Sequence, residues 1–453
     1  MIQTDICIIG AGASGLMAAV FAAVSPFKVL LIEKNTACGR KLSITGKGRC
    51  NITNTADVEE SLRNVPGSGK FLYSAFHAMN NRDIVRFFEE RGLETVAERG
   101  GRIFTKSGKA QDVTELLRRT AVSNGVQLLL GDTVIHARSV NGATETDTGS
   151  IFDKTAELTT GAVKVMKNGV EEAVTTDSPV RFSVRLKSGR EVRSRALIIA
   201  TGGLSYPGTG STGDGYRWAE AFGHSIIAPK PSLVPLVTKE KWPSRLSGLT
   251  LKNVVLTLYA PDGPSLYSEL GEMLFTHFGI SGPLVLSGSR YLSKYEFQDC
   301  RVSIDLKPGL SEEKLYRRIT RDFELYSRKS LRNALKDLLP SGLIPILIEQ
   351  SGCDGELCVS EITREQKNRL VSVFKGLPLT VTASRPIAEA IITAGGVKTT
   401  EINPSTLESK RVPRLYFCGE VLDVDAFTGG FNLSIAFSTG FLAGKSAGQS
   451  LPQ

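Results

Sequence analysis

The residues best placed to do chemistry lie near the amino terminus, where a glycine-rich turn follows a short apolar run. Residues 6–9, Ile-Cys-Ile-Ile, are typical of a buried parallel strand, and the turn GAGASG comes directly after them. Gly10 permits the tight bend, Gly12 lets the backbone approach a pyrophosphate, and Gly15 lets the following helix lie close to the sheet. The amides that open this helix would face the phosphates.

An acidic residue completes this unit. Residues 28–32 predict a second strand, and Glu33 stands at its end, where a carboxylate can accept hydrogen bonds from a ribose. This favours an unphosphorylated ribose, as in FAD or NAD. A GxGxxG pattern alone is most often a flexible loop, but here strand, helix and acid are all in register. The sequence therefore predicts an adenine dinucleotide site.

The same glycine spacing recurs in GTGSTG, at Gly208, Gly210 and Gly213. Its surroundings differ, because Pro207 precedes it, no strand leads directly into it, and no acid ends a strand at the required distance. We therefore expect no phosphate loop for a second dinucleotide here.

Length and composition limit the number of domains and the class of protein. A chain of 453 residues should hold two or three domains, and 41% hydrophobic with 22% charged residues is ordinary for a globular protein. The apolar stretch near the amino terminus is interrupted by Ser25, Pro26 and Lys28, so we expect neither a signal peptide nor a membrane span. The seven scattered cysteines include no CxxC pair, which favours reduced thiols in a cytoplasm and no metal site.

The net charge of +9 has two interpretations: affinity for polyanions, or a basic surface that also suits an anionic cofactor and substrate. The densest basic stretch, residues 314–332, alternates with acidic and apolar residues at helical spacing. A solvated helix face is the favoured interpretation of that stretch.

The segment of residues 35–54, shortly after Glu33, is polar and punctuated by glycines, and we predict an irregular loop. Its position would lay it along the extended dinucleotide, where its cations could reach the pyrophosphate and its donors the flavin. Cys38 and Cys50 are farther apart than the close pair of disulfide reductases, so we interpret both as non-catalytic. The basic side chains of this segment are Arg40, Lys41, Lys47 and Arg49.

Hydrophobic patterning predicts the elements that must position this site. A buried strand over 196–200 ends in Thr201-Gly202-Gly203, and small residues there allow close packing against a bound dinucleotide. Residues 141–178 are polar and rich in glycine and threonine, and we predict an exposed hairpin with little chemistry. The other expected elements are helices over 71–91 and 111–123, a strand over 126–130, and a hairpin of residues 180–186 and 191–195.

Near the carboxyl terminus a short strand over 414–418 leads into a second candidate region. An acid just past such a strand, Glu420 or Asp423, can bind a ribityl hydroxyl. Gly430 and Asn432 then stand at the start of a helix whose amino-terminal dipole could face the flavin and stabilise the anion formed on reduction. The alternative is a terminal helix that only packs against its neighbours.

Between residues 227 and 385 the pattern shifts to short alternating strands, such as 254–259 and 301–306, which suggests a β-barrel. Helices interrupt this pattern from Ser311, a residue type that caps helix amino termini. The loop THFGISGP carries His277, whose imidazole could exchange a proton beside the flavin. A structural role for this histidine is the alternative.

In combination, a series of motifs resembles the bacterial flavoprotein family called HI0933-like or BaiN-like, which has aminoacetone oxidase-type members. In chain order the motifs are GAGASG, GRKLSITGKGRCNITN, ERGGRIF, ATGGLSYPGTGSTGDGY, GEMLFTHFGISGP, ITAGGV and YFCGEVLDVDAFTGGFNLSIAFSTG, and they cover almost the whole chain. The segment 141–178 is longer than the family pattern.

The resemblance implies an α/β protein with a glutathione-reductase-type FAD-binding Rossmann domain built from both chain ends. An insert with a β-barrel and a small helical part interrupts that domain. We place the FAD-binding domain at 1–226 and 386–453, the insert at 227–385, and the helical part of the insert at 311–352.

We therefore expect a cytoplasmic FAD-dependent oxidoreductase that acts on a small organic substrate by hydride transfer to or from the flavin. The resemblance allows amine oxidation or reduction of an activated C=C bond. If NAD(P)H donates the electrons, it should visit the flavin transiently, since no second dinucleotide motif is evident. We expect no stable nucleic acid partner and no membrane, and the oligomeric state stays open.

Two alternatives remain. A tRNA-modifying flavoprotein would also join an amino-terminal FAD fold to inserted domains, and the chain is basic. A non-catalytic flavin-binding protein is possible because no residue is an unmistakable acid, base or nucleophile. His277 is the catalytic candidate. The predicted cofactor-binding residues are Gly10, Gly12, Ala13, Ser14, Gly15, Glu33, Lys34, Arg40, Lys41, Cys50, Asn51, Thr201, Gly202, Gly419, Glu420, Asp423, Gly430, Phe431 and Asn432.

Overall fold

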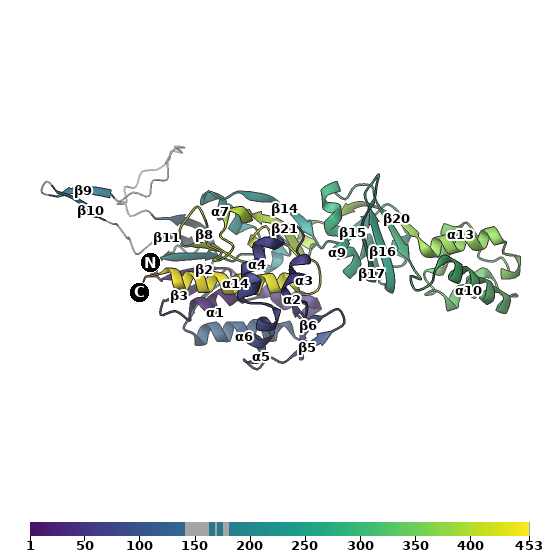
Figure 1. Ribbon diagram of the computed structural model, residues 1–453, viewed down its shortest axis with the longest axis horizontal. Helices are drawn as coiled ribbons and strands as arrows, with labels where there is room; N and C mark the ends of the chain where they lie inside the picture. The colour runs from purple at the N-terminus through teal and green to yellow at the C-terminus, as the bar shows by residue number, and fades with distance from the viewer. Residues whose placement is uncertain (141–162, 168–169, 175–180, 453) are drawn as a thin grey trace.

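A five-stranded parallel sheet lies at the centre of the part built from the two chain ends (Figure 1). The strand order is β22-β13-β2-β3-β7, and all strands except the edge strand β7 are fully buried runs, as is typical of a parallel sheet that is covered on both faces. The computed structural model describes residues 1–140, 163–167, 170–174 and 181–452. The sheet comprises β2 (Ile6–Ile9), β3 (Val29–Glu33), β7 (Gln127–Leu130), β13 (Ala196–Ile199) and β22 (Leu415–Phe417).

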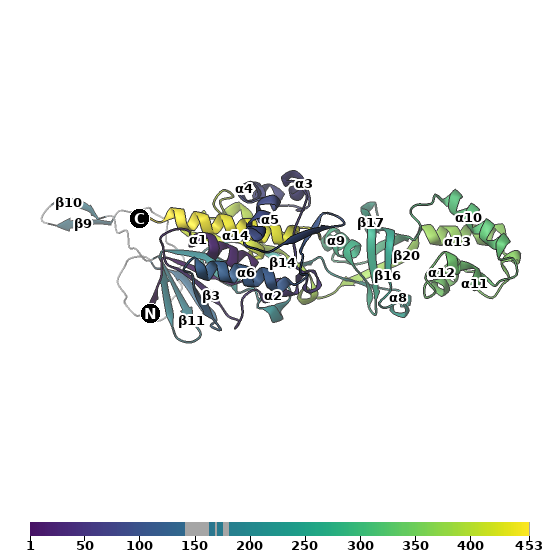
Figure 2. The same ribbon diagram turned by 90° about the horizontal axis from the view of Figure 1, so that it is seen from below.

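Two helices from opposite ends of the chain lie side by side on this sheet (Figures 1 and 2). They are α1 (Ala13–Ala22), which follows β2, and α14 (Phe431–Ser450). A Cβ atom on Gly440 or Gly444 of α14 would overlap backbone carbonyl oxygens of α1. The small residues of the last helix therefore allow the two chain ends to pack closely.

Two smaller sheets complete this part. The predicted hairpin of residues 180–186 and 191–195 is confirmed as the antiparallel pair β11 and β12. Within the predicted hairpin over 141–178, β9 (Val163–Lys167) pairs with β10 (Val170–Val174), and the rest of that segment lies outside the described residues. The four-stranded sheet comprises β1 (Ile2–Gln3), β12 (Glu191–Ser194), β11 (Phe182–Leu186) and β8 (Val134–Ser139), and the three-stranded sheet β4 (Asn51–Asn54), β6 (Arg102–Thr105) and β5 (Thr95–Glu98).

The prediction of one helix over 71–91 is wrong. The chain forms α4 (Tyr73–Ala78) and α5 (Asn81–Glu89), with a break at Asn80. The Asn80 side chain accepts a hydrogen bond from the Asp83 amide, and the Asp83 carboxylate accepts one from the Asn80 amide. This capping box starts a second helix, while the apolar periodicity continues across the break.

The prediction of an irregular loop over 35–54 is also wrong in part. The segment contains α2 (Arg40–Gly48) and then β4. Leu42 is 2% exposed and anchors the helix to the core. The helix is kinked, and its backbone becomes left-handed at Lys47, where φ is 58°. A polar sequence can therefore form regular structure here because one apolar side chain fixes it.

The predicted β-barrel is confirmed by a closed barrel of order β15-β18-β17-β16-β19-β20. Two antiparallel strands, β14 (Ile226–Ser232) and β21 (Ile392–Val397), lie between the barrel and the parallel sheet. The division of the chain after residues 226 and 385 stays a prediction. The barrel strands are β15 (Leu236–Thr238), β16 (Thr250–Tyr259), β17 (Ser265–Thr276), β18 (Gly279–Ser281), β19 (Cys300–Asp305) and β20 (Leu377–Ser384).

A group of helices between β19 and β20 forms the end of the molecule far from both chain termini (Figures 1 and 2). Ser311 caps the first of them, as its residue type predicts. The helical part continues to Lys375 rather than ending at residue 352, because a second capping box at Thr363 starts a further helix. The helices are α10 (Glu312–Leu325), α11 (Leu331–Ala334), α12 (Ile344–Ser351) and α13 (Arg364–Lys375).

All seven cysteines are free thiols. Among the described residues, none of the helices combines the length and apolarity that crossing a membrane requires. In the same part of the chain, no group of three or more His, Cys, Asp or Glu side chains is placed to hold a metal ion. The remaining α-helices are α3 (Val58–Arg63), α6 (Ala110–Ser123), α7 (Asp214–Ala221), α8 (Trp242–Arg245) and α9 (Pro283–Leu292).

Candidate cofactor site

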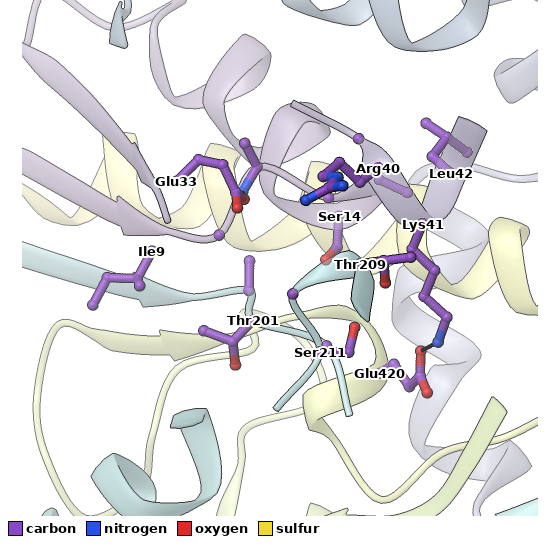
Figure 3. Close-up of a pocket in the computed structure, with 18 of the residues that line it drawn as sticks. Ile9, Ser14, Glu33, Arg40, Lys41, Leu42, Thr201, Thr209, Ser211 and Glu420 are labelled. Carbon is purple, nitrogen blue, oxygen red and sulfur yellow. Dashed lines mark hydrogen bonds and ion pairs between the residues drawn. The ribbon is translucent and has the colours of Figure 1, made fainter. Parts of the chain in front are cut away.

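A pocket lies along the carboxyl ends of the parallel strands, which is where open α/β sheets bind their ligands. Its walls come from both chain ends (Figure 3). The first segment supplies the turn after β2, the end of β3 and the start of α2. The last segment supplies Glu420 and the first turns of α14, and the loop after β13 completes the wall.

The three glycines of the first turn have different neighbours. A Cβ atom on Gly10 or Gly15 would overlap backbone carbonyl groups, so the packing of the chain itself requires both. A Cβ atom on Gly12, in contrast, would meet nothing within 4 Å. Since Gly12 lines the pocket, the space beside it is available to a ligand.

Glu33 is held at the end of β3 by hydrogen bonds to its carboxylate. Oε2 accepts one from the Ala11 amide at 2.8 Å, and Oε1 accepts two from Asn35, from the backbone amide at 2.9 Å and from Nδ2 at 2.7 Å. The side chain is buried and lines the pocket, and Oε2 retains acceptor capacity. This is the position in which a carboxylate accepts a ribose hydroxyl, and that contact stays a prediction.

Lys34 connects the end of β3 to α7. Its Nζ donates to Asp214 Oδ2 at 2.8 Å and to Thr212 Oγ1 at 2.5 Å. Burial by itself raises the pKa of Asp214, but hydrogen bonds from Lys34, Thr212 and Arg217 bring that pKa below its usual value. Lys34 and Asp214 therefore form a charged part of the pocket wall, with the carboxylate ionised.

Lys41 and Glu420 form a second ion pair in the wall (Figure 3). The lysine Nζ is 2.6 Å from Glu420 Oε2 and 2.5 Å from Ser205 Oγ. The other carboxylate oxygen accepts hydrogen bonds from Ser205 Oγ and from the Thr393 amide, each at 2.8 Å. Four separate segments of the chain are thus joined at this point of the pocket.

The amino terminus of α14 reaches the pocket through Asn432. The Asn432 side chain accepts a hydrogen bond from the Ala426 amide at 2.9 Å and donates one to the Ala426 carbonyl at 2.7 Å. Gly430 precedes the helix with φ +106°, and a Cβ there would overlap the Thr53 carbonyl. Gly430 is therefore required by packing against β4, and the helix lines the pocket from Asn432 onward.

Many of the predicted cofactor residues line the pocket, and the others lie beside or behind it. Gly419, for example, packs against the Ser14 hydroxyl, and Asp423 binds the Val397 carbonyl through its backbone amide. The predicted residues that line the pocket are Gly10, Gly12, Ala13, Ser14, Glu33, Lys34, Arg40, Lys41, Thr201, Gly202, Glu420 and Asn432. Those outside its lining, whose contact with a cofactor stays a prediction, are Gly15, Cys50, Asn51, Gly419, Asp423, Gly430 and Phe431.

Cys50 is fully buried, and burial raises the pKa of its thiol to about 12. A protonated, inaccessible thiol is a poor nucleophile, as expected for a non-catalytic cysteine. His277 lies on the turn between β17 and β18, outside the pocket lining. Its exposed ring packs edge-on against Phe278, at 4.9 Å between centroids.

Several pocket residues were missed by the sequence analysis. Thr209, Gly210 and Ser211 belong to the GTGSTG segment, which was rejected as a second phosphate loop but forms a wall of this pocket. Asn35 Nδ2 donates to the Thr209 carbonyl at 3.0 Å and fixes the loop there. The glycine spacing of this segment was the signal in the sequence that could have placed it at the cofactor site. The other missed lining residues include Leu42, Asp132, Thr133, Val134, Trp218, Ile392, Val424, Leu433, Ile435 and Ala436.

The residues present fit an adenine dinucleotide. The pocket is lined by the turn that opens α1, at Gly10, Gly12 and Ser14, and by the acid that ends β3. The free space at Gly12, the amides that open α1 and the acid at the end of β3 add the features that FAD requires.

Comparison with known families agrees with this geometry. Residues 4–169 and 150–446 match the family described as HI0933-like protein Rossmann domain. The chain belongs to the HI0933-like family. Its α/β fold, with a FAD-binding Rossmann domain built from both chain ends, is thereby confirmed. The full-length similarity to a reductase described next confirms its assignment as a FAD-dependent oxidoreductase.

Two relatives are similar over almost their whole length. The ribosomal RNA dihydrouridine synthase of Haemophilus influenzae is 32% identical over 436 residues, which is 96% of each chain. The 3-dehydro-bile acid delta(4,6)-reductase of Clostridium scindens is 30% identical over 446 residues, which is 98% of each chain. Among solved structures, the 3-ketosteroid delta1-dehydrogenase of Sterolibacterium denitrificans is 13% identical with a TM-score of 0.51 over 100% of both chains, which shows a shared fold.

Proposed function

We propose that this protein reduces an activated carbon–carbon double bond by hydride transfer from FAD. The observation that carries the proposal is the full-length similarity to relatives of two kinds. One is named as a reductase of a bile acid, and the other as an enzyme that makes dihydrouridine. Both names denote addition of a hydride and a proton across a C=C bond, in substrates where a carbonyl group can activate that bond.

The pocket geometry supports the same chemistry. Bound FAD would supply the hydride, and the protein would supply orientation and electrostatics. Glu33 would hold the adenosine ribose and the turn at Gly12 the pyrophosphate. Lys41 and Glu420 would shape the ribityl side of the pocket, while the amides at the start of α14 would favour negative charge on the flavin.

The second hydrogen must reach the substrate as a proton, and we propose His277 as its source. The exposed position of this imidazole on the turn between two barrel strands supports access to a substrate between barrel and cofactor. A change of His277→Gln should lower kcat by about 100-fold and leave the FAD content unchanged. The exposed His136, on β8, provides a control as His136→Gln. An unchanged kcat in the first variant would remove His277 from the mechanism.

For the substrate we propose a small conjugated carbonyl compound. A uridine within RNA is the second candidate, because one relative acts on ribosomal RNA and the net charge of +9 suits a polyanion. RNA binding through phosphate contacts would weaken steeply as salt rises. Oxidation of an amine such as aminoacetone and non-catalytic flavin binding are the remaining alternatives.

The direction of electron flow separates these possibilities. The holoenzyme is reduced without oxygen and mixed separately with a conjugated steroid ketone and with unmodified ribosomal RNA. We expect the ketone to reoxidise the flavin and to gain two hydrogens by mass spectrometry. Reoxidation by RNA alone would establish the second candidate. Reduction of the oxidised flavin by aminoacetone would establish amine oxidation, and no reaction with any of the three would leave a flavin-binding role.

NAD(P)H is proposed as the electron donor, visiting the flavin only transiently. The sequence predicts no turn for a second dinucleotide, and the GTGSTG segment lies in the wall of the FAD pocket. A resident second dinucleotide is therefore not part of the proposal. We also propose a cytoplasmic location, which the seven free thiols support. Rates of flavin reduction by NADH and NADPH would test the first proposal, and cell fractionation the second.

A further inference from the structure

A buried ion pair joins the barrel part to the segment that precedes α14. Arg290 on α9 donates from Nε to Asp425 Oδ2 at 2.7 Å and from Nη2 to Asp425 Oδ1 at 3.3 Å. The Asp425 side chain is only 3% exposed, and its Oδ2 also accepts a hydrogen bond from Ser232 at 2.7 Å. A two-point contact between guanidinium and carboxylate fixes orientation as well as distance.

The same face of α9 holds the residues that follow Asp425. Ser287 Oγ lies 2.9 Å from Thr428 Oγ1, and the ring of Tyr291 stacks on Phe427 with centroids 5.6 Å apart and planes at 24°. Arg290 and Tyr291 follow Ser287 by three and four positions, so both lie on the face of the helix that carries Ser287. The segment 425–428 is therefore fixed along its length by α9.

This segment is also part of the cofactor site. Val424, directly before Asp425, lines the pocket. On the other side, Asn432 lines the pocket and binds both the amide and the carbonyl of Ala426. The segment therefore has α9 of the insert on one side and the start of α14 on the other. Each of residues 425–428 makes a contact with one of these two helices.

We propose that Arg290 is a positioning residue: through Asp425 it holds Val424 and the start of α14 in the places that bind the flavin. The barrel is thereby coupled to the affinity of the protein for FAD and to the flavin potential. Removal of the guanidinium leaves a buried carboxylate without its cation, which destabilises the position that the segment now occupies. The inference rests on the FAD site and not on the substrate proposed above.

The test compares Arg290→Met, Arg290→Lys and the double variant Arg290→Met/Asp425→Asn. We expect Arg290→Met to raise the Kd for FAD by at least about tenfold and to shift the flavin reduction potential, with partial recovery in Arg290→Lys. Removing both charges should restore thermal stability, because the asparagine amide oxygen still accepts the hydrogen bond from Ser232. It should not restore FAD affinity or potential, since the two-point contact is still missing. Arg245→Met is the matched control, because Arg245 pairs with Glu349 at 2.6 Å with both side chains more than half exposed.

Parent-like Kd and potential in Arg290→Met would overturn the proposal. So would a double variant in which affinity and potential recover together with thermal stability, because the pair would then be structural only. If Arg290→Met does not fold, the lysine and double variants decide the question by the same two measurements. No substrate is added, so failure of this inference and failure of the proposed reduction are seen in separate experiments.

Discussion

Lys41 and Glu420 stand 379 positions apart in the chain, and their Nζ and Oε2 atoms lie 2.6 Å apart. One follows β3 in the first segment and the other follows β22 in the last. Because parallel strands end at the same edge of a sheet, both residues reach the pocket there. The pair therefore ties the two chain ends together across the cofactor site.

Removal of the lysine charge should weaken this closure. We expect Lys41→Met to lower the stability of the holoenzyme by about 1.5–3 kcal/mol, as for hydrogen bonds to a charged group, and to weaken FAD binding. Thermal unfolding and FAD titration measure the two effects. Lys106→Met is the control, since Lys106 and Glu94 form an exposed pair, and such pairs contribute little to stability.

A second substitution distinguishes a lost contact from an unpaired charge. Adding Glu420→Gln to Lys41→Met removes the carboxylate charge left without its lysine, so the double variant should be more stable than Lys41→Met alone. Equal stabilities of the two variants would show that the Glu420 charge needs no partner at this site.

Gly12→Val should abolish FAD binding without unfolding the protein. The residue has φ −77° and ψ −169°, which valine can adopt, and a Cβ there meets no atom within 4 Å. Its side chain would occupy the space proposed for the pyrophosphate. Purified Gly12→Val should be colourless with a circular dichroism spectrum like that of the apoprotein. Gly309→Val is the control, because a Cβ on Gly309 also has free space but lies far along the chain, between β19 and α10. A yellow Gly12→Val protein would show that FAD does not lie against this turn.

The fold could be predicted where the signal is local. The strands before and after the first turn, the hairpin of β11 and β12 and the cap at Ser311 each depend on a few neighbouring residues. The break between α4 and α5 was missed because apolar periodicity continues across it, although Asn80 and Asp83 carried a capping signal. The helix α2 was missed because its stability depends on burying Leu42 against distant elements.

The residues of the site were also predicted where the signal is local and missed where it depends on tertiary contacts. Gly12 and Glu33 were predicted because their roles follow from position relative to a strand. Thr209 was missed, since only the tertiary hydrogen bond from Asn35 brings its loop to the pocket. Of the two acids predicted to bind a ribityl hydroxyl, Glu420 lines the pocket and Asp423 does not; the spacing from β22 alone could not distinguish them.

Acid should destabilise the protein through His224. Burial lowers the pKa of this histidine, whose Nδ1 is 3.1 Å from Glu401 and whose Nε2 is 2.7 Å from Ser409. The unfolded chain takes up this proton near pH 6.5 and the folded protein only at lower pH, so stability falls below pH about 6.5, by at most about 1.4 kcal/mol per pH unit. Thermal unfolding of parent and His224→Gln, followed from pH about 6.5 down to pH about 5, should show a smaller decline of Tm in the variant.

Glu401 extends the effect to stronger acid. Its hydrogen bond from Arg411 holds the pKa of the carboxyl at about 2. This contribution is present above the unfolded pKa near 4.3 and is lost as the pH falls from there toward the folded value. The control for His224→Gln is His136→Gln, since the His136 side chain is exposed. A decline of equal slope in His224→Gln and parent would assign the acid sensitivity to other groups.

The last prediction tests whether the start of α14 faces the flavin. Leu433 lies in the first turn of this helix and lines the pocket. Leu433→Gln and Leu433→Glu have nearly the same shape, so any difference between them reports charge alone, and an acid in the first turn does not disfavour the helix. A carboxylate near the flavin should oppose the negative charge gained on reduction. We expect the potential of Leu433→Glu to lie below that of Leu433→Gln by about 30 mV, equivalent to about 1.4 kcal/mol for two electrons. Redox titration of both FAD-loaded variants at low and high salt provides the measurement, and a difference that shrinks with salt would identify it as electrostatic. Equal potentials at low salt would mean that the amino terminus of α14 does not act on the flavin, and its electrostatic role would have to be given up.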